Sequence, residues 1–186
     1  FHPIVATIHA QVEAGALGDL RGFDARFMMA NTPDPQASLF NLAQGGGALM
    51  HCGIYPLSLA RHLLGPIVDM QTLAQIAETG VDEDSALTLR HTNGALSTVR
   101  ASLRAAGPDG ATLFGTLATL HIRGPIWRPT DAVLVPTHTS GSGPQKPRRL
   151  EGFRESKAGL RLSGALSRVK ALTGRKRKRL RAPFAG

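Results

Sequence analysis

Residues 45–65 read GGGALMHCGIYPLSLARHLLG, which is three glycines followed by apolar residues at helical spacing and a closing glycine. This pattern predicts a helix over residues 48–64 that ends at Gly65. Because glycine has no Cβ, the three glycines allow a ligand or another stretch of backbone to come close to the start of that helix. They also predict free N–H groups that point outward at the helix start.

The segments on either side of this helix predict a sheet. Before it, a short amphipathic helix over residues 4–14 is followed by a strand over residues 20–29. The Asn93-Gly94 pair, further along, predicts a type I′ turn between two strands. Two early helices followed by hairpin-linked strands predict an α+β fold, in which a mainly antiparallel open sheet carries helices on one face. The candidate strands after the second helix are residues 68–78, 85–91, 95–103, 111–114, 119–123 and 132–135.

The composition limits the class of protein. A chain of 186 residues fits one packed core with an appendage rather than two full domains. Its longest apolar run falls well short of the roughly 18–20 residues of a membrane span, which excludes a transmembrane protein. The single cysteine, Cys52, cannot form an internal disulfide, and no signal peptide is visible, so we expect a cytoplasmic protein. Because the chain opens at Phe1 instead of Met, we expect it to be part of a longer protein.

The net charge of +9 is concentrated at the C-terminal end. Residues 145–186 contain 14 Lys and Arg against two acids, whereas residues 1–144 contain 8 Arg and 11 acids. A stretch rich in Ser, Gly and Pro over residues 137–147 separates the two parts. We therefore predict one domain over residues 1–136, followed by a linker and a basic, partly helical segment over residues 137–186.

The basic segment has apolar residues at roughly helical spacing between Phe153 and Leu172, followed by a cationic run over residues 175–179. This pattern predicts a basic amphipathic helix. One interpretation is a solvated excursion between two ordered elements. The other is contact with nucleic acid or anionic lipid through residues 145–181. Neither aromatic interleaving nor a base-reading motif supports the nucleic-acid alternative.

Four polar side chains of the predicted helix over residues 48–64 are spaced so that they share one side. His51, Tyr55, Ser58 and His62 stand at i, i+4, i+7 and i+11. The residues expected to lie largely away from them are Leu49, Ile54, Leu57 and Leu64. Such a stripe is either exposed to water or lines a site.

The spacing of other residues argues against several kinds of site. No HExxH or paired-cysteine motif occurs, and His51 and His62 are too far apart on a helix to bind one metal ion, so we expect no metal site. Cys52 is expected to be a buried small apolar residue. No GxGxxG follows a strand and no Walker motif occurs, so we expect no dinucleotide site in this chain. Residues 1–144 contain no lysine, which excludes a lysine base there.

Residues 45–65 resemble the signature helix of the Gfo/Idh/MocA oxidoreductase family, whose pattern is G-G-G-x-x-x-D-x-G-x-[HY]. Neighbouring segments agree with this resemblance over roughly residues 1–135 and are similar to the dihydrodiol-dehydrogenase-like branch. These segments are Phe1-His2-Pro3, residues 15–21, Leu39-Phe40-Asn41, residues 79–83, Gly115-Thr116 and Trp127-Arg128-Pro129-Thr130.

The resemblance implies the second domain of a two-domain enzyme that uses NAD or NADP. In the family, an N-terminal Rossmann domain binds the cofactor and carries the lysine of a Glu-Lys-Pro motif, and this chain contains neither. The second domain supplies the substrate pocket and an open sheet through which copies associate, so a homo-oligomer is implied. The implied reaction transfers a hydride between the nicotinamide and a sugar, cyclitol or dihydrodiol-type alcohol. The alternative is a non-catalytic oligomerising module with a polyanion-binding basic tail.

The resemblance also implies roles for single residues. Tyr55 falls on the His/Tyr position of the motif, where it would donate a proton or orient the substrate, and His51 falls on the Asp position. A histidine can relay a proton near neutral pH, but it supplies no fixed negative charge. Ser38 stands where relatives carry Arg. The implied catalytic residues are His51 and Tyr55, and the implied substrate-binding residues are Phe40, Gly47, Trp127 and Arg128.

Overall fold

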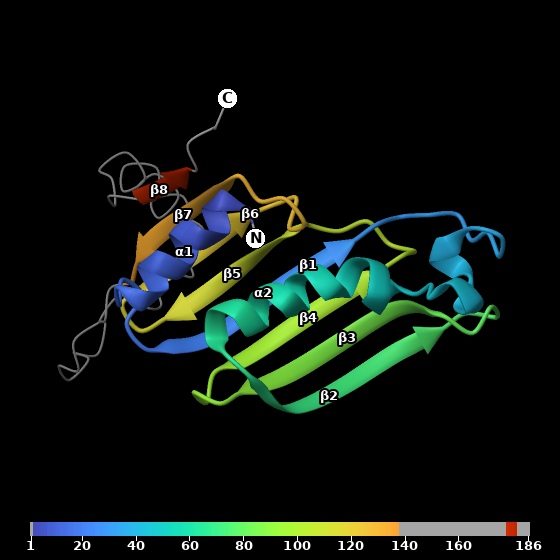
Figure 1. Ribbon diagram of the computed structural model, residues 1–186, viewed down its shortest axis with the longest axis horizontal. Helices are drawn as coiled ribbons and strands as arrows, with labels where there is room; N and C mark the ends of the chain where they lie inside the picture. The colour runs from blue at the N-terminus through green and yellow to red at the C-terminus, as the bar shows by residue number, and fades with distance from the viewer. Residues whose placement is uncertain (1, 138–177, 182–186) are drawn as a thin grey trace, which may run out of the picture. The chain divides into compact units, whose positions relative to one another are not determined.

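The computed structural model describes residues 2–137 and 178–181. Within them the chain forms helices on one side of a sheet (Figure 1). None of the described helices is long and apolar enough to cross a membrane. The helical elements are α1 (Pro3–Glu13), the short turns η1 (Ser38–Phe40) and η2 (Leu42–Gln44), the π-helical turn η3 (Leu49–Gly53) and α2 (Ile54–Leu64). The strands are β1 (Leu20–Met28), β2 (Ile67–Ile76), β3 (Asp82–His91), β4 (Leu96–Ser102), β5 (Gly110–Gly115), β6 (Ala118–Arg123), β7 (Asp131–Pro136) and β8 (Lys178–Arg181).

The strands of the described residues form one eight-stranded sheet in the order β2-β3-β4-β1-β5-β6-β7-β8. Every neighbouring pair is antiparallel except β1 and β4, which run parallel. Figure 1 shows α1 and α2 lying over the same face of this sheet. The sheet does not close on itself, because β2 and β8 are its two edges. The predicted α+β fold with a mainly antiparallel open sheet is therefore confirmed.

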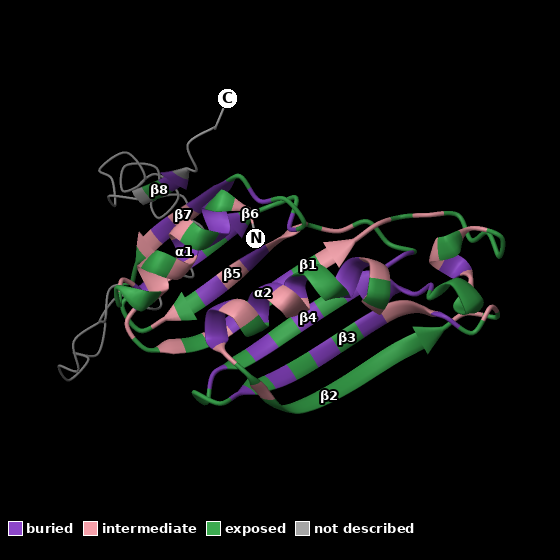
Figure 2. Ribbon diagram, in the orientation of Figure 1, coloured by how far each residue is buried: buried purple, intermediate pink, exposed green. Residues whose placement is uncertain are grey.

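The core lies between the sheet and the two helices. Along β3 and β4 buried and exposed residues alternate, which is the period of a strand with one covered face (Figure 2). Phe23 of β1, Leu113 of β5 and Leu120 of β6 are fully buried and pack with Ile4 and Ile8 of α1. The opposite face of the sheet, which we call the open face, carries the exposed residues of the same strands. The amphipathic pattern of the sequence thus fixes which side of each strand faces the helices.

The hairpin between β3 and β4 was predicted at the right place with the wrong turn type. A type I′ turn needs a positive φ at both central residues, and no non-glycine residue in the described part of the chain has one. Instead, the N–H of Gly94 donates to the carbonyl oxygen of His91 at 2.9 Å, and Gly94 itself has φ 82°. This is a type I turn followed by a left-handed glycine, so the glycine of the pair sits one place later in the loop than a type I′ turn requires.

The described part of the basic segment belongs to the sheet. Lys178 and Arg179, predicted as the cationic end of a helix, lie in β8, which pairs with β7. Arg179 donates from Nε and Nη2 to the two carboxylate oxygens of Asp131 at 2.8 and 2.9 Å, and Leu180 is buried. The predicted helix over residues 153–172 lies outside the described residues. The division into residues 1–136 and 137–186 stays a prediction, with β8 joining the later part to the sheet of the earlier one.

We predict that the stability of the domain falls as the pH drops below about 6.5, because His62 resists protonation in the folded state. The imidazole rings of His9 in α1 and His62 in α2 stack with their centres 4.7 Å apart. Burial first, and the charge on His9 second, lower the pKa of His62. The unfolded chain therefore binds the proton more readily, and the free energy of unfolding declines between the unfolded and folded pKa values of His62.

Urea denaturation at a series of pH values from about 8 to about 5 measures this decline. The variant His62→Gln removes the group and should flatten the curve over this range. Glu13 is a charged group beside the pair, with its carboxylate 3.9 Å from His9 Nε2, so Glu13→Gln serves as the comparison. An unchanged pH dependence in His62→Gln would assign the decline to another group.

Candidate functional site

The glycine turn before η3 is held by backbone contacts. The N–H of Gly46 donates to the carbonyl oxygen of Asn41 at 2.9 Å, and the N–H of Gly47 donates to that of Leu39 at 2.9 Å. A Cβ on Gly46 would lie 2.7 Å from the carbonyl oxygens of Ser38 and Leu39. The glycines were predicted to allow close approach of either a ligand or another stretch of backbone. The structure shows the second, because backbone atoms of residues 38–41 lie against Gly46. The prediction that these N–H groups are free was wrong, because the preceding turns η1 and η2 use them.

Asp82 at the start of β3 occupies the N-terminal end of the same helix. Its Oδ2 accepts hydrogen bonds from the N–H of Leu49 at 2.8 Å and from the hydroxyl of Ser85. A carboxylate at a helix start is favourable because the unpaired N–H groups carry partial positive charge there. Sequence reasoning missed this role, since Asp82 lies 33 residues from Leu49 and no local spacing connects them. The place where an outside anion would bind is thus filled by the chain itself.

Asp82→Ala is expected to lower the free energy of unfolding by about 1–2 kcal/mol, which is the usual cost of losing a helix-capping side chain. The loss leaves the half-buried N–H of Leu49 without its acceptor. Urea denaturation measures the change. Asp84→Ala is the matched control, because Asp84 lies on the same strand and its carboxylate makes no hydrogen bond or ion pair with the described residues. Equal losses in the two variants would refute the capping role.

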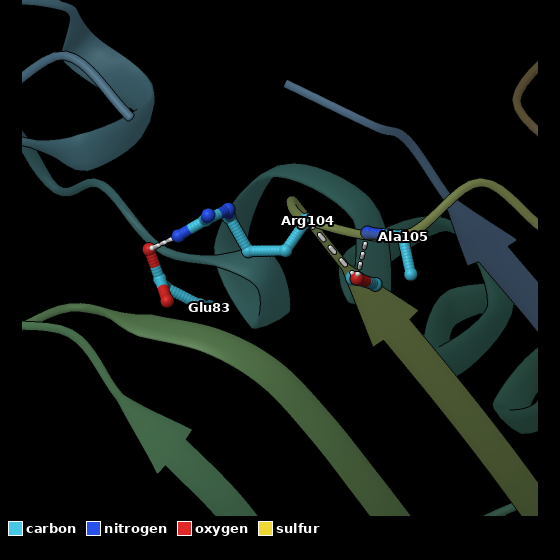
Figure 3. A network of polar contacts seen from close by, with 4 residues as sticks. Glu83, Arg104 and Ala105 are labelled. Atoms are coloured by element: carbon cyan, nitrogen blue, oxygen red, sulfur yellow. Dashed lines mark hydrogen bonds and ion pairs between the residues drawn. The ribbon is translucent and has the colours of Figure 1, made fainter. Parts of the chain in front are cut away.

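A group of hydrogen bonds around Ser102, at the end of β4, lies next to η3. The hydroxyl of Ser102 accepts hydrogen bonds from the N–H groups of Arg104 and Ala105, and Arg104 donates to Glu83 at 2.7 Å (Figure 3). The carbonyl oxygen of Ser102 accepts a weak hydrogen bond from Cys52 Sγ at 3.7 Å. Burial raises the pKa of Cys52 to about 11, so its thiol stays protonated at neutral pH. Cys52 is buried, as the sequence predicts.

The π-helical turn η3 separates the side chains that an uninterrupted α-helix would align. His51 turns back so that its Nδ1 lies 3.3 Å from the carbonyl oxygen of Gly47, which also accepts the N–H of His51. At the other end of the stripe, His62 stacks on His9. Tyr55 and Ser58 line one pocket. The structure therefore brings together the middle two of the four residues in the predicted stripe.

The pocket at Tyr55 has a volume of about 390 Å³ and lies where α1, α2 and the loop over residues 124–130 meet. Ile54 also lines it and is 45% exposed, so the prediction that Ile54 points away from the polar stripe was wrong. The reason is the spacing within α2 itself, because Ile54 and Ser58 stand at i and i+4 and therefore lie on the same side of the helix. The lining residues are His2, Val5, Ile54, Tyr55, Ser58, Leu59, Ile126, Trp127 and Pro129.

Two aromatic side chains give this pocket its apolar character. Tyr55 is 44% exposed, and its ring meets that of Phe27 edge to face with centres 5.8 Å apart. Trp127 is 52% exposed on the facing loop. That loop is fixed by Asp109, whose Oδ1 accepts the N–H of Ile126 at 3.0 Å and whose carboxyl pKa is raised by burial. An apolar pocket with a few hydroxyl and imidazole groups suits a compact polar ring compound.

His2 is a residue of this pocket that sequence reasoning did not single out. It precedes α1, and its Nδ1 is buried without a hydrogen-bond partner among the described residues. A buried nitrogen of this kind usually has a partner, so its position beside a pocket is notable. The sequence identified His2 only as part of the segment Phe1-His2-Pro3, because only the folded chain places α1 against α2.

The remaining predicted site residues lie elsewhere. Phe40 is 1% exposed and packs with Cys52, Val81 and Leu103 in a separate core cluster. Gly47 is buried in the glycine turn, where its φ of 125° and the nearby Asp82 carboxylate leave no room for a side chain. Arg128 is exposed next to Trp127, and its guanidinium bonds to none of the described residues. The substrate contacts assigned to these three residues stay predictions.

The described residues contain no group of three or more His, Cys, Asp or Glu side chains placed to hold a metal ion. Two further hollows lie on the open face of the sheet, and both are lined by Asp24 and Arg26. Neither of them is lined by any of the site residues that the sequence predicts. The pocket at Tyr55 is therefore the candidate site.

Comparison with known proteins identifies the family of this domain. A model of the Gfo/Idh/MocA C-terminal domain matches residues 5–121. The trans-1,2-dihydrobenzene-1,2-diol dehydrogenase of Bos taurus is 28% identical over 149 residues, which is 79% of this chain and 44% of that enzyme. The chain thus spans less than half the length of this curated relative.

Solved structures share the fold. An NAD-binding oxidoreductase from Klebsiella pneumoniae has a TM-score of 0.63 at 24% identity, over 75% of this chain and 42% of its own. Levoglucosan dehydrogenase in complex with NADH and levoglucosan has a TM-score of 0.64 at 20% identity, over 75% of this chain and 41% of its own. The domain match, the dehydrogenase relatives and the shared fold agree with one another, and the chain belongs to the Gfo/Idh/MocA oxidoreductase family, of which it carries the C-terminal domain.

Proposed function

We propose that this domain binds the substrate of an NAD- or NADP-dependent oxidoreductase that acts on a sugar, cyclitol or dihydrodiol-type alcohol. The observation that carries the proposal is the pocket of about 390 Å³ that is lined by both Tyr55 of the family's signature helix and Trp127. Relatives named as dihydrodiol and levoglucosan dehydrogenases support this class of substrate. When bound, the nicotinamide would accept or supply the hydride at the carbon that carries the hydroxyl group.

In this proposal Tyr55 moves the proton. Its phenol can donate a hydrogen bond to a substrate oxygen, or accept a proton from a substrate hydroxyl. The ring is held against Phe27, so the hydroxyl has a defined position at the edge of the pocket. Ser58, one turn further along α2, offers a second hydroxyl to the same ligand.

Trp127 would supply the platform for the ring of the substrate. An indole face packs against the C–H groups of a sugar or cyclitol, and it stacks on the ring of a dihydrodiol. The loop over residues 124–130 that carries it is anchored at Asp109, so the platform does not need to order on binding. Arg128, predicted to bind the substrate, lies on the same loop.

His51 would act by relaying a proton rather than by touching the substrate in this pocket. Its ring bonds to the carbonyl oxygen of Gly47, at the turn that leads into the signature helix. Because the carbonyl oxygen only accepts a hydrogen bond, Nδ1 carries the hydrogen, and Nε2 would be the nitrogen that takes up and returns the proton. The family motif has Asp at this place, so this proposal gives His51 the proton-relay part of that role without its fixed charge.

The described residues do not fit the phosphates of a dinucleotide. The N–H groups of Gly46, Gly47 and Leu49, which would be the cradle at the helix start, donate to Asn41, Leu39 and Asp82. We therefore propose that NAD or NADP is bound mainly by another domain of a longer protein. This domain would present Tyr55 and the substrate to that cofactor.

Association of copies through the open face is a further part of this proposal. Arg26 of β1 and Arg100 of β4 stand directly opposite each other at the centre of that face. Neither guanidinium makes a hydrogen bond or ion pair with the described residues. A second copy would bring an acceptor for these groups, because the carboxylate of Asp24 lies on the same face. The alternative, an oligomerising module whose residues 145–181 bind polyanions, and the expected cytoplasmic location both remain predictions.

Fluorescence of Trp127 tests the proposed pocket directly, because it is the only tryptophan of the chain. Titration with a dihydrodiol, an anhydrosugar and an inositol should give a saturable change for one of these classes. The variant Ser58→Phe fills the pocket and should abolish the change. In parallel, the longest reading frame that contains these residues is assayed with both nicotinamide cofactors. Turnover without any response of Trp127 would place the substrate elsewhere, and absence of both would overturn the proposed function.

A further inference from the structure

The edge strand β2 is exposed on both of its faces. All of its residues except Ile67 are exposed, and four of them are large and apolar (Figure 2). Helix α2 does not cover this strand in the way it covers its neighbours, since β3 and β4 alternate between buried and exposed residues. The exposed fractions of the apolar side chains are 57% for Val68, 58% for Met70, 81% for Leu73 and 61% for Ile76.

This edge lacks the features that usually prevent pairing with another strand. Natural sheet edges are kept apart by lysine, proline, short length or inward-pointing charge. β2 has ten residues and contains neither lysine nor proline. Its single charged residue, Asp69, accepts a hydrogen bond from the N–H of Met70 and lies 4.0 Å from Arg90 of β3. A long, apolar and unprotected edge is a surface on which another strand can pair.

The charge pattern in the middle of β2 is compatible with pairing to its own reverse. The register with β3 is regular from Asp69 to Gln75 and shifts at both ends of that stretch, so the midpoint of the regular part is Thr72. A two-fold axis at Thr72 would set Asp69 opposite Gln75, Met70 opposite Ala74 and Gln71 opposite Leu73. The only charge then faces an amide, and an apolar pair lies on the helix side of the sheet. An axis at Leu73 would leave Asp69 and Met70 without partners in the regular stretch.

We propose that β2 pairs antiparallel with the β2 of a second copy of this chain, about a two-fold axis at Thr72. The two sheets then continue into one, and the backbone groups at both edges gain hydrogen-bond partners. The partner is a second copy because, in this register, the only charge of the strand faces an amide and the apolar residues Met70 and Ala74 face each other. This interface is separate from the one proposed on the open face. Thr72 lies opposite the buried Leu87 and therefore belongs to the helix side of the sheet.

Disulfide trapping tests the register. Residues directly opposite in an antiparallel pair have Cβ atoms about 4.5–5.5 Å apart, which is close enough for a disulfide after small adjustments. In Thr72→Cys the two introduced thiols would face each other, and under mild oxidation this variant should form covalent dimers at least about tenfold faster than Leu73→Cys. In Leu73→Cys the thiols are diagonal, at about 7–8 Å or more. Cys52 contributes no background, because it is buried and its pKa is about 11.

Sedimentation of the 186-residue chain tests the interface without a cross-link. Thr72→Lys places two like charges on the axis and should raise the dimer dissociation constant at least about fivefold, whereas Thr72→Val should leave it unchanged or lower it. Circular dichroism confirms that Thr72→Lys is folded, which we expect because residue 72 is exposed. Three results would overturn the proposal: a monomeric wild-type chain, equal trapping in Leu73→Cys, or a dimer that dissociates in Arg26→Glu and survives in Thr72→Lys.

Discussion

Tyr55→Phe is expected to lower kcat of the full-length enzyme by about 100-fold or more, with KM changed by less than about threefold. The substitution removes one hydroxyl and keeps the ring, which packs edge to face on Phe27. The pocket should therefore keep its shape, and the substrate should still bind against Trp127. What is lost is the group that moves a proton to or from the substrate oxygen. Steady-state rates, followed by the absorbance of the reduced nicotinamide, measure both constants.

Ser58→Ala is the matched control for this prediction. It removes the other hydroxyl that α2 contributes to the same pocket. Because this group is assigned to binding only, the variant should raise KM while kcat stays within about threefold of the wild-type value. If Tyr55→Phe retained its kcat, the proton would be moved by another group, and His51 would become the first candidate.

Most of the fold could be predicted from local patterns in the sequence. The helix that ends at Gly65, the strand that ends at Met28 and the hairpin around Gly94 all follow from short-range spacing of apolar residues and glycines. These features depend on neighbours within a few positions along the chain. The strand β8 could not be found in this way, because four residues within a cationic run become a strand only where β7 offers an edge. Its anchor, Asp131, lies 48 residues before Arg179.

The candidate site was predictable only in part for the same reason. Tyr55 and Trp127 were identified through resemblance to a family, and the structure places both in one pocket. His2 was missed, since its place depends on how α1 packs against α2. The capping role of Asp82 was missed because its partner is the backbone N–H of Leu49, and every residue type except proline has such a group. The π-turn at residues 49–53 also has no simple sequence pattern, and it separates His51 from the stripe that an ideal helix would form.

Gly46→Ala is expected to lower the free energy of unfolding by about 3 kcal/mol or more, which would lower the melting temperature by roughly 6–12 °C in a chain of this size. A Cβ on residue 46 would lie 2.7 Å from the carbonyl oxygens of Ser38 and Leu39 and 2.9 Å from the nitrogen of Asn41. All three atoms are backbone, so no side chain can rotate away. The turns η1 and η2 would have to shift, and the hydrogen bond from Gly46 to Asn41 would be stretched or broken.

Gly45→Ala is the control that separates the clash at residue 46 from the cost of placing any non-glycine residue in this turn. Gly45 has φ 74°, and a Cβ there would meet nothing within 4 Å, so the variant should lose only the 1–2 kcal/mol or so of a left-handed non-glycine residue. Thermal unfolding of both variants measures the difference. If the two losses were equal, backbone conformation alone would explain the glycines. A larger loss in Gly46→Ala would instead mean that contact between two backbone segments positions the signature helix, and with it Tyr55, so this variant should lose activity as well as stability.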